Sequence, residues 1–332
     1  MIASMPKVSK RKLESFSFVL SGRSSMPFDE FVNWALYDPN IGYYRTRRKR
    51  VGKDASNDFY TSTSLGRVWG ELILDASLKL LAKRPPSKFV FVEIGAEPET
   101  SILDGLKHPF AHHKVIRLGD KIEIPRNAIV YSNEWLDAQP FKRFKYDKKR
   151  GTWLELFVGL SDFKLVQIEK ETENPLVLSF PNPVNDGYLI DWPSGSISSL
   201  NELASNPSWF GVFMTFDYGL TRSCLFNDRP EGTARAYSKH KMLSELLSNP
   251  GEQDLTCHLC WDNLRESLEL AGFKNVTLAS QESFLMTHSH AQIKEIFEQN
   301  KTPMNNKMLA LRELIHPAHL GHGLQALSAV RF

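Results

Sequence analysis

Three short motifs with acidic or amide side chains follow apolar runs in this sequence, and they are the first candidates for chemistry. They are Glu93-Ile-Gly95, Ser132-Asn-Glu134 and Asp217-Tyr-Gly219. A carboxylate in such a position can hold a cationic group through a bidentate charged pair and can accept the proton that a nucleophile loses. For Glu134 the structural alternative is the first turn of a following helix, where the helix dipole favours an acid.

A polar loop near residue 250 adds candidates for contact with a substrate. Its sequence, Pro250-Gly-Glu-Gln-Asp-Leu-Thr-Cys-His258, is typical of a shaped loop that presents one or two polar side chains. Loops of this kind carry binding residues more often than core elements do. The candidate substrate-binding residues are Tyr218, Gln253, Asp254 and His258.

Two other patterns indicate chemistry less specifically. Cys257-His-Leu-Cys260 has the spacing of half a zinc site, which Cys224 and a histidine could complete, but the sequence holds no second such pair. We therefore expect no metal site. The basic run at residues 45–50 could contact phosphate, but it has no interleaved aromatic side chains, so a solvated loop is the favoured interpretation.

The three motifs need a scaffold that places them together. Residues 88–94, 128–131 and 209–216 are apolar runs of the kind that a parallel sheet buries on both faces. In an open α/β sheet, ligands bind outside the carboxyl ends of such strands. We therefore predict an α/β fold with a doubly wound, Rossmann-like core, and we expect Glu93, Glu134 and Asp217 at one edge of its sheet.

Helical periodicity predicts the helices that cover this sheet, at residues 28–36, 65–82, 261–271, 291–297 and 306–314. Residues 141–190 alternate instead with period two, most clearly at 152–158 and 164–168, which predicts antiparallel strands. We divide the chain accordingly. The predicted parts are a flexible tail at 1–25, a core with covering helices at 26–140 and 209–332, and an antiparallel insertion at 141–208.

Composition narrows the class of protein. The chain has 332 residues, 42% of them hydrophobic and 24% charged, which is ordinary for a globular protein with a sizeable core. A net charge of +3 gives no global field for nucleic-acid or membrane-surface binding. Three cysteines indicate a reducing compartment, and no apolar run reaches the roughly 18 residues of a membrane span. We expect a soluble cytoplasmic protein, or a mitochondrial matrix protein if the source is eukaryotic, with neither nucleic acid nor membrane as partner.

Taken in order, the motifs resemble those of the MidA/NDUFAF-type family of S-adenosylmethionine-dependent methyltransferases. The motifs are Asn57-Asp-Phe-Tyr-Thr-Ser62, Trp69-Gly-Glu71, Ser132-Asn-Glu-Trp-Leu-Asp-Ala-Gln-Pro140, Phe216-Asp-Tyr-Gly219, Gly232-Thr-Ala-Arg-Ala-Tyr237, the loop at 250–258, Gln281-Glu-Ser-Phe-Leu285 and Pro317-Ala-His-Leu-Gly321. The resemblance covers residues 26 to 330 approximately. That family includes a mitochondrial complex I assembly factor that methylates a protein arginine.

The resemblance implies a function and a set of site residues. It implies that S-adenosylmethionine is the cofactor and that the methyl group goes to a side chain of a protein partner, with arginine as a candidate. The implied catalytic residues, in an Asn-Glu-x-x-Asp pattern, are Asn133, Glu134 and Asp137. The implied cofactor-binding residues are Asp58, Thr61, Glu93, Gly95 and Asp217.

The sequence departs from the family pattern after its first strand. Where the family has alternating glycines, this chain reads Glu93-Ile-Gly-Ala-Glu-Pro-Glu-Thr100, so that only Gly95 remains. Glu97 and Glu99 place two carboxylates beside the carboxylate of the cofactor, which they repel unless a cation intervenes. The alternative for these two residues is a solvated helix N-terminus.

The next segment is short for its expected content. Glu93 and Asn133 are 40 positions apart, which holds little more than one helix and one short strand. A carboxylate for the ribose is expected at the end of the second strand. The local option is the strand-like stretch at 114–118 with Asp120, which resembles the strand that follows the missing one. The second hypothesis is therefore a methyltransferase-like protein that has lost cofactor binding and acts as a binding or complex-assembly module.

Overall fold

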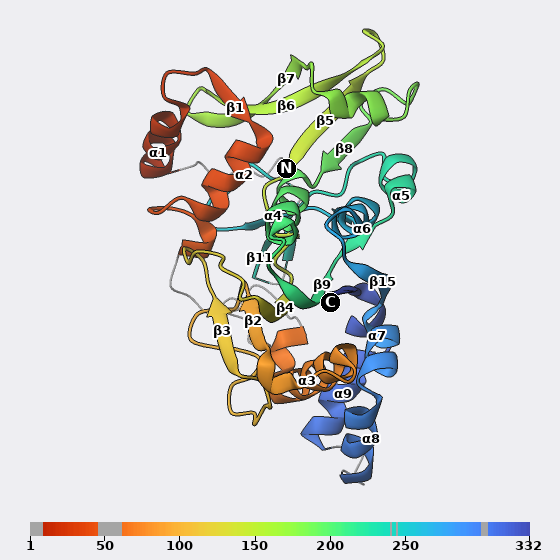
Figure 1. The fold of residues 1–332 in the computed structure, drawn as a ribbon. Coiled ribbons are helices and arrows are strands. Elements are labelled where there is room, and N and C mark those ends of the chain that lie inside the picture. The colour runs from red at the N-terminus through yellow and green to blue at the C-terminus, as the bar shows by residue number, and fades with distance from the viewer. Residues whose placement is uncertain (1–8, 46–61, 240, 244, 300–304) are drawn as a thin grey trace. The chain divides into compact units, whose positions relative to one another are not determined.

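The computed structural model describes residues 9–45, 62–239, 241–243, 245–299 and 305–332. The chain, traced in Figure 1, forms two compact units of three segments each. Unit 1 consists of Met1–Arg48, Asp137–Ser198 and Leu220–Cys260, and unit 2 of Lys49–Leu136, Ser199–Gly219 and Trp261–Phe332. Within the described ranges, no helix combines the length and the apolar character that crossing a membrane requires.

Unit 2 is built on a six-stranded sheet in the order β15-β16-β9-β4-β2-β3. Four neighbouring strands run parallel: β3 (His112–Ile116), β2 (Val90–Ile94), β4 (Asn127–Asn133) and β9 (Phe210–Asp217). β16 (Gln325–Arg331) is antiparallel to both β9 and β15 (Lys274–Ser280). The three apolar runs predicted as strands correspond to β2, β4 and β9, and the predicted α/β class is confirmed.

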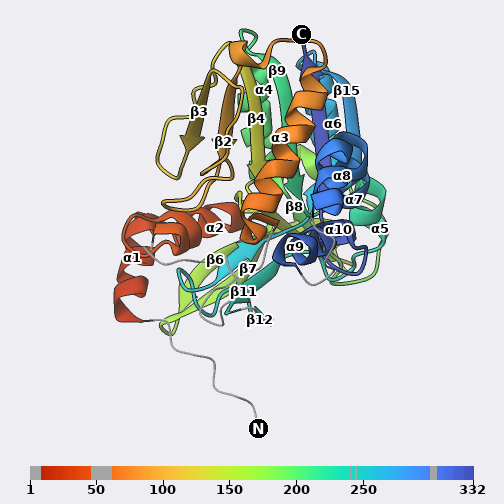
Figure 2. The ribbon, with the colours of Figure 1, turned by 90° about the horizontal axis from the view of Figure 1, so that it is seen from below.

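Helices cover both faces of this sheet (Figures 1 and 2). One face carries α3 (Arg67–Leu81), α7 (Gln281–His288), α8 (His290–Gln299) and α9 (Asn306–Ile315). The other carries α6 (Trp261–Leu270) and the second half of α4 (Ser194–Ser205), which begins in unit 1. The buried Trp69 of α3 donates a hydrogen bond from Nε1 to the hydroxyl of Tyr131 in β4 at 2.7 Å, which fixes this helix on the strand that leads to Glu134. Shorter elements are the 3₁₀ helices η2 (Ser62–Leu65) and η3 (Pro86–Lys88), and α10 (Leu320–Gly323).

The segment between β2 and β4 has fewer regular elements than the sequence suggests, because β3 is the one helix or strand among its described residues. β3 pairs directly with β2, with Ile116 opposite Ile94, so the stretch near residues 114–118 is the immediate neighbour of the first strand and not the strand after a missing one. Residues 95–111 and 117–126, all described, form turns and coil without a helix. The expectation that Glu97 and Glu99 begin a helix is therefore wrong. β4 begins directly after the second of these stretches, at Asn127.

A larger and a smaller antiparallel sheet lie in unit 1. The larger is formed by β1 (Ser25–Pro27), β5 (Lys142–Asp147), β6 (Thr152–Ser161), β7 (Lys164–Glu171) and β8 (Leu189–Trp192), and the smaller by β11 (Arg235–Ser238), β12 (Lys241–Leu243) and β13 (Asp254–Thr256). β6 and β7 are the strands that the period-two pattern predicts. The remaining elements are α1 (Lys10–Leu20), α2 (Phe28–Tyr37), α5 (Arg222–Asn227), η1 (Tyr43–Arg45), η4 (Pro175–Ser179), β10 (Gly219–Leu220) and β14 (Leu259–Cys260).

Part of the segment expected as a flexible tail forms a packed helix. α1 lies within residues 1–25, and its Phe16 is fully buried, with ring centroids 5.1 Å from Trp34 and 6.5 Å from Phe31 of α2. Phe16 and Leu20, four residues apart, lie on one side of the helix and are its buried positions. Its three basic residues, Lys10, Arg11 and Lys12, lie in the first turn of the helix. The predicted domain boundaries otherwise remain a proposal.

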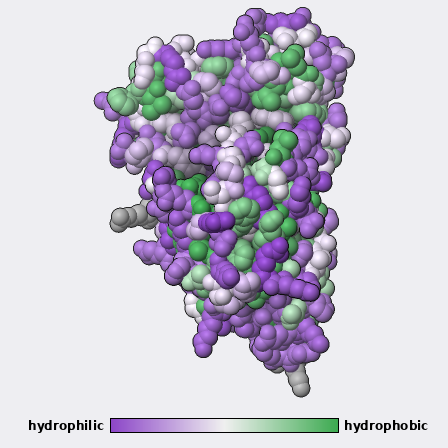
Figure 3. Space-filling model, viewed as in Figure 1, coloured by the Kyte–Doolittle hydropathy of each residue, from purple (hydrophilic) through white to green (hydrophobic). Residues whose placement is uncertain are grey.

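The surface seen in Figure 3 is mainly hydrophilic, and its hydrophobic side chains lie in small separate patches. A monomeric protein typically has single exposed apolar side chains of this kind. Among the described residues on this face there is no broad apolar area to indicate a large docking surface.

Candidate functional site

The sheet of unit 2 brings the three sequence motifs to one edge. Ile94 lies opposite Ser132 in the β2–β4 ladder, and Asn133 lies opposite Phe216 in the β4–β9 ladder. Because these strands are parallel, the residues that follow them emerge on the same side. The turns beginning at Gly95, Glu134 and Asp217 are therefore neighbours in the structure, as the pattern of apolar strands predicts.

Glu134 is held in an uncommon backbone conformation at this edge. Its φ is +47°, in the left-handed region that residues other than glycine rarely adopt. Its N–H donates to the carbonyl oxygen of Phe216 at 2.8 Å, and its Oε1 accepts a hydrogen bond from Nδ2 of Asn133 at 3.0 Å. The next regular element after β4 is the strand β5, so the alternative in which Glu134 begins a helix is wrong. Such strain is common where a protein must aim a functional side chain.

Asp217 supports this turn. Its side chain is fully buried, with Oδ2 accepting from the N–H of Leu136 at 3.1 Å and Oδ1 from the N–H of Tyr218 at 2.8 Å. The resemblance implies a role in cofactor binding for Asp217, and Tyr218 is a candidate for substrate binding. Because these two contacts of the Asp217 carboxylate are with the protein backbone, we interpret it as the residue that positions the turn after Glu134.

The end of β2 is organised by Glu93 and Gly95. Glu93 is 4% exposed, and its Oε2 accepts a hydrogen bond from the N–H of Ile102 at 3.1 Å and lies 3.5 Å from Nε2 of His113. Gly95 has φ +78°, and a Cβ atom there would lie 3.0–3.1 Å from side-chain atoms of Trp135. A larger residue at position 95 would therefore be strained twice, by its backbone conformation and by this contact.

Trp135 is a site residue that sequence reasoning missed. Its side chain packs over Gly95, so it connects the turn after β4 with the turn after β2. The available signal was its place directly after Glu134 in the motif at 132–140. That signal has no chemical specificity, because an indole at a strand end is more often part of the core than of a site.

Unit 1 holds a second cluster, formed by two carboxylates and two tyrosines. Thr256 donates a hydrogen bond from Oγ1 to Oδ2 of Asp137 at 3.1 Å, and the hydroxyl of Tyr44 donates to Oδ1 of Asp254 at 3.0 Å. Asp254 and Thr256 are two residues apart on β13, so their side chains share a face. Tyr37 stacks on Tyr44 with ring centroids 5.5 Å apart. Asp137 and Asp254 are therefore brought together, and neither tyrosine was among the predicted site residues.

Burial sets the protonation states in this cluster. It raises the pKa of the Asp137 carboxyl to about 6, against the hydrogen bond from Thr256, which lowers it. Burial and the negative charges of Asp254 and Asp137 raise the pKa of Tyr37 and of Tyr44. Both phenols therefore stay protonated at neutral pH, and the hydroxyl of Tyr37 donates to the carbonyl oxygen of Ala138 at 2.6 Å.

Two of the predicted substrate-binding residues have mainly internal contacts. Gln253 is fully buried, and its Nε2 donates to the carbonyl oxygens of Glu245 and Leu246 at 3.1 and 2.8 Å. We interpret it as the residue that shapes the loop at 250–258. His258 has a pKa lowered to about 4, first by burial and then by Arg235 and Arg229, so its imidazole is neutral at physiological pH.

Asp58 and Thr61, predicted for cofactor binding, lie outside the described residues, as do positions 46–50 of the basic run. All three cysteines are described, and none forms a disulfide; Cys257 and Cys260 are buried. In the part of the chain that the structure describes, no group of three or more His, Cys, Asp or Glu side chains could hold a metal ion.

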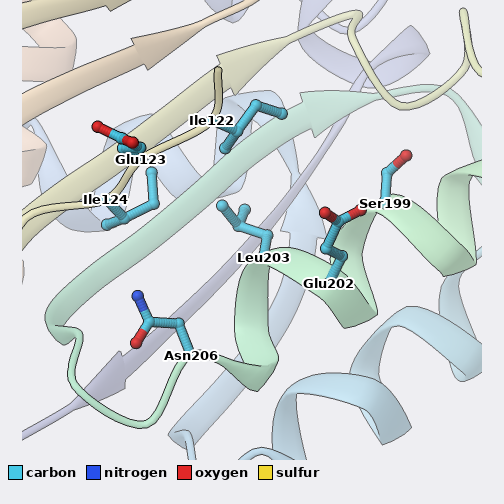
Figure 4. Close-up of a pocket in the computed structure, with 7 residues that line it drawn as sticks. All are labelled: Ile122, Glu123, Ile124, Ser199, Glu202, Leu203 and Asn206. Atoms are coloured by element: carbon cyan, nitrogen blue, oxygen red, sulfur yellow. The ribbon is translucent and has the colours of Figure 1, made fainter.

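A cavity of about 310 Å³ lies elsewhere in unit 2 (Figure 4). Its lining residues are Ile122, Glu123, Ile124, Ser199, Glu202, Leu203 and Asn206. These residues belong to the coil that precedes β4 and to α4 with the residue that follows it, Asn206, and α4 precedes β9. The cavity therefore lies toward the amino ends of these strands, away from the edge that carries Asn133 and Asp217.

The edge of unit 2 fits the cofactor that the resemblance implies. Gly95 allows a close backbone turn after β2. Oδ1 of Asn133 is buried and accepts no hydrogen bond from the residues that the structure describes. Buried polar atoms in proteins almost always have a partner, so a ligand that brings a donor to this edge would satisfy it.

Residues 77–278, more than half of the chain, match the model of the family described as S-adenosyl-L-methionine-dependent methyltransferases. No curated protein sequence matches the chain. Among solved structures, a COG1565 superfamily member from Burkholderia thailandensis bound to S-adenosyl-homocysteine is 19% identical, with a TM-score of 0.83 over 99% of this chain and 95% of that one.

A native structure of a COG1565 superfamily protein from the same organism is 18% identical, with a TM-score of 0.80 over 99% of this chain and 95% of that one. At this level of identity the two structures establish a shared fold, in agreement with the predicted fold class. The family match extends from α3 through β15 and so includes the turns at Gly95, Glu134 and Asp217. The chain belongs to the S-adenosyl-L-methionine-dependent methyltransferase family, with S-adenosyl-L-methionine as the cofactor of that family.

Proposed function

We propose that this chain transfers a methyl group to a side chain of a protein partner and that the acceptor is arginine. The observation that supports this proposal most directly is the cluster of Asp137, Asp254, Tyr37 and Tyr44 in unit 1. Two carboxylates beside aromatic rings form a site for a planar cation.

Arginine suits this cluster better than lysine does. A guanidinium is always charged and presents five donors in a fixed plane, so it can contact two carboxylates at once. The raised pKa of Asp137 expresses the cost of keeping its charge in a buried position. A bound cation removes that cost, and a guanidinium keeps its positive charge in a buried position where an ammonium loses it more readily.

The residues at the edge of unit 2 have a separate role in this proposal. When bound, S-adenosyl-L-methionine supplies a methyl group attached to a sulfonium. We assign Glu134 as the general base of the transfer, and Asn133 keeps Oε1 of Glu134 in place through its amide. The transfer itself depends mainly on positioning the two reactants, which rigid turns at strand ends provide.

The proposal is tested with labelled S-adenosyl-L-methionine and arrayed peptides that differ only at a central arginine, lysine or glutamine. Label in the arginine peptides alone supports it, and label in the lysine peptides alone refutes it. A calorimetric titration with S-adenosylhomocysteine addresses the second hypothesis, a binding or assembly module without cofactor. Absence of heat and of a thermal shift at millimolar ligand would favour that module.

The acceptor cluster predicts a pH dependence. Since the pKa of Asp137 is raised to about 6, the carboxylate becomes protonated below this pH and loses its attraction for a guanidinium. We expect kcat/KM for an arginine peptide to fall about tenfold per pH unit below pH 6. Asp137→Asn should lower kcat/KM at pH 8 and remove this limb of the profile.

The same shift has a consequence for stability. A carboxyl with a raised pKa binds more protons in the folded state than in the unfolded state, so its ionisation lowers stability as the pH rises from about 4 to 6. Asp137→Asn should therefore raise the melting temperature at pH 8 and change it little at pH 4. Asp162→Asn, at an exposed turn between β6 and β7, serves as the control. An unchanged pH profile in the Asp137 variant would contradict the assignment.

A further inference from the structure

The turn that follows β2 is held by an arginine from the neighbouring strand. Arg117 directly follows β3, and its Nε donates a hydrogen bond to the carbonyl oxygen of Glu97 at 3.3 Å. Its Nη2 donates to the carbonyl oxygen of Thr100 at 2.8 Å. One guanidinium therefore connects two backbone positions of the turn at residues 95–100, the turn that in the family carries alternating glycines.

The position of Arg117 is itself fixed by the protein. Its backbone N–H donates to Oδ2 of Asp120 at 2.8 Å, which closes a tight turn after β3. The N–H of Gly95 donates to the carbonyl oxygen of Ile116 at 3.0 Å, which continues the β2–β3 ladder to the start of the turn. The arginine and the turn that it contacts are thus tied to the same pair of strands.

The sequence of this turn, with one glycine and two acidic residues, is unfavourable for a tight turn beside a carboxylate of the cofactor. Glu99 has φ +63°, a left-handed backbone conformation that is unfavourable for residues other than glycine. Glu97 and Glu99 also bring negative charge to the position where the carboxylate of the cofactor is expected. A guanidinium bonded to two carbonyl oxygens of the turn holds its backbone and adds a positive charge to this end of the sheet.

We propose that Arg117 is a positioning residue that replaces the missing glycines of the cofactor turn by a side-chain clamp. The resemblance implies a turn with alternating glycines, whereas this turn is held by hydrogen bonds from outside it. The proposal rests on cofactor binding by this chain and is independent of whether the acceptor is arginine.

The test measures S-adenosylhomocysteine affinity by calorimetry in the full chain and in three variants. Arg117→Met should weaken binding on the order of tenfold, because it keeps most of the length of the side chain and removes the clamp. The affinity of Arg117→Lys should lie between those of Arg117→Met and the unaltered chain. A lysine keeps the charge but cannot bridge two carbonyl groups in one plane. The control is Lys121→Met, which removes an exposed cation of the same coil. Lys121 forms an ion pair with Glu123, and the variant should bind S-adenosylhomocysteine as tightly as the unaltered chain does.

Amide hydrogen exchange without ligand provides a second readout, which tests the Arg117 contacts independently of cofactor binding and methyl transfer. The amides of Glu97, Glu99 and Thr100 should exchange faster in Arg117→Met than in the unaltered chain, and Arg117→Lys should show a smaller increase. Equal exchange in all variants, or affinity in Arg117→Met within twofold of the unaltered chain, would overturn the proposal. If the unaltered chain binds no S-adenosylhomocysteine, the proposed function fails, while the exchange data still decide whether the clamp exists.

Discussion

Replacing Glu134 by glutamine is expected to lower the rate of methyl transfer about 10²- to 10⁴-fold, the usual contribution of a general base. Glutamine keeps the size of the side chain and can still contact Asn133, but it cannot accept a proton. The turn should survive, because the contacts that hold it involve the backbone of residue 134 and the carboxylate of Asp217. The affinity for S-adenosylhomocysteine should stay within a few-fold of that of the unaltered chain. Single-turnover kinetics measures the rate of transfer, and calorimetry measures the affinity.

The matched control for this variant is Glu123→Gln, which removes a carboxylate from the coil before β4. Its turnover should equal that of the unaltered chain. Unchanged turnover in Glu134→Gln would refute the role assigned to Glu134. An equal loss of cofactor affinity and of turnover would instead show that the residue shapes the binding edge.

Replacing Asp191 by alanine is expected to lower the free energy of unfolding by about 3–5 kcal/mol, the cost of leaving a buried charge without its partner. Asp191 is 1% exposed, and Arg143 donates to its Oδ1 from Nε at 2.6 Å. Its Oδ2 accepts from the backbone N–H groups of Thr233 and Ala234 at 2.6 and 2.7 Å. The variant would leave a guanidinium and two backbone donors unsatisfied inside unit 1.

The geometry around Asp191 also accounts for the glycine in the motif at 232–237. A Cβ atom at Gly232, which has φ +71°, would clash with Oδ2 of Asp191. Gly232 therefore permits the backbone to approach the carboxylate, and the motif can be explained by structure without a substrate.

A double-mutant cycle provides the control for this prediction. Arg143→Ala alone should destabilise the chain, and Asp191→Ala combined with Arg143→Ala should cost less than the sum of the two single changes, because neither charge is then left alone. Urea unfolding followed by tryptophan fluorescence measures all three variants. Strict additivity would show that the two side chains do not act as a pair.

The elements that sequence predicts best in this chain are those whose burial pattern is uniform. β2, β4 and β9 are buried along almost their whole length, so each gives a continuous apolar run, and the residues that follow them lie at one edge of the sheet. α3 was predicted because its buried side chains recur at helical spacing. The edge that carries Gly95, Glu134 and Asp217 follows from these strands alone.

Elements and contacts that depend on distant partners could not be predicted in the same way. β3 is half-exposed and polar at its start, so its residues give no clear hydrophobic pattern. Its place beside β2 depends on the hydrogen-bonded pairing of the two strands. Tyr37 and Tyr44 contact residues that lie far along the chain, at positions 138 and 254. The carboxylate of Asp217 gave a clear chemical signal, but its backbone partners can be identified only in the folded chain.

The place of β16 in the sheet of unit 2 has a consequence for the synthesis of the protein. This strand lies between β9 and β15 although it follows both in the chain. During synthesis, the side of β9 that pairs with β16 remains without its partner. An open strand edge is a template for incorrect strand pairing. Unit 2 can close only when residues 325–331 have left the ribosome, so the edge of β9 stays open in the nascent chain until they emerge.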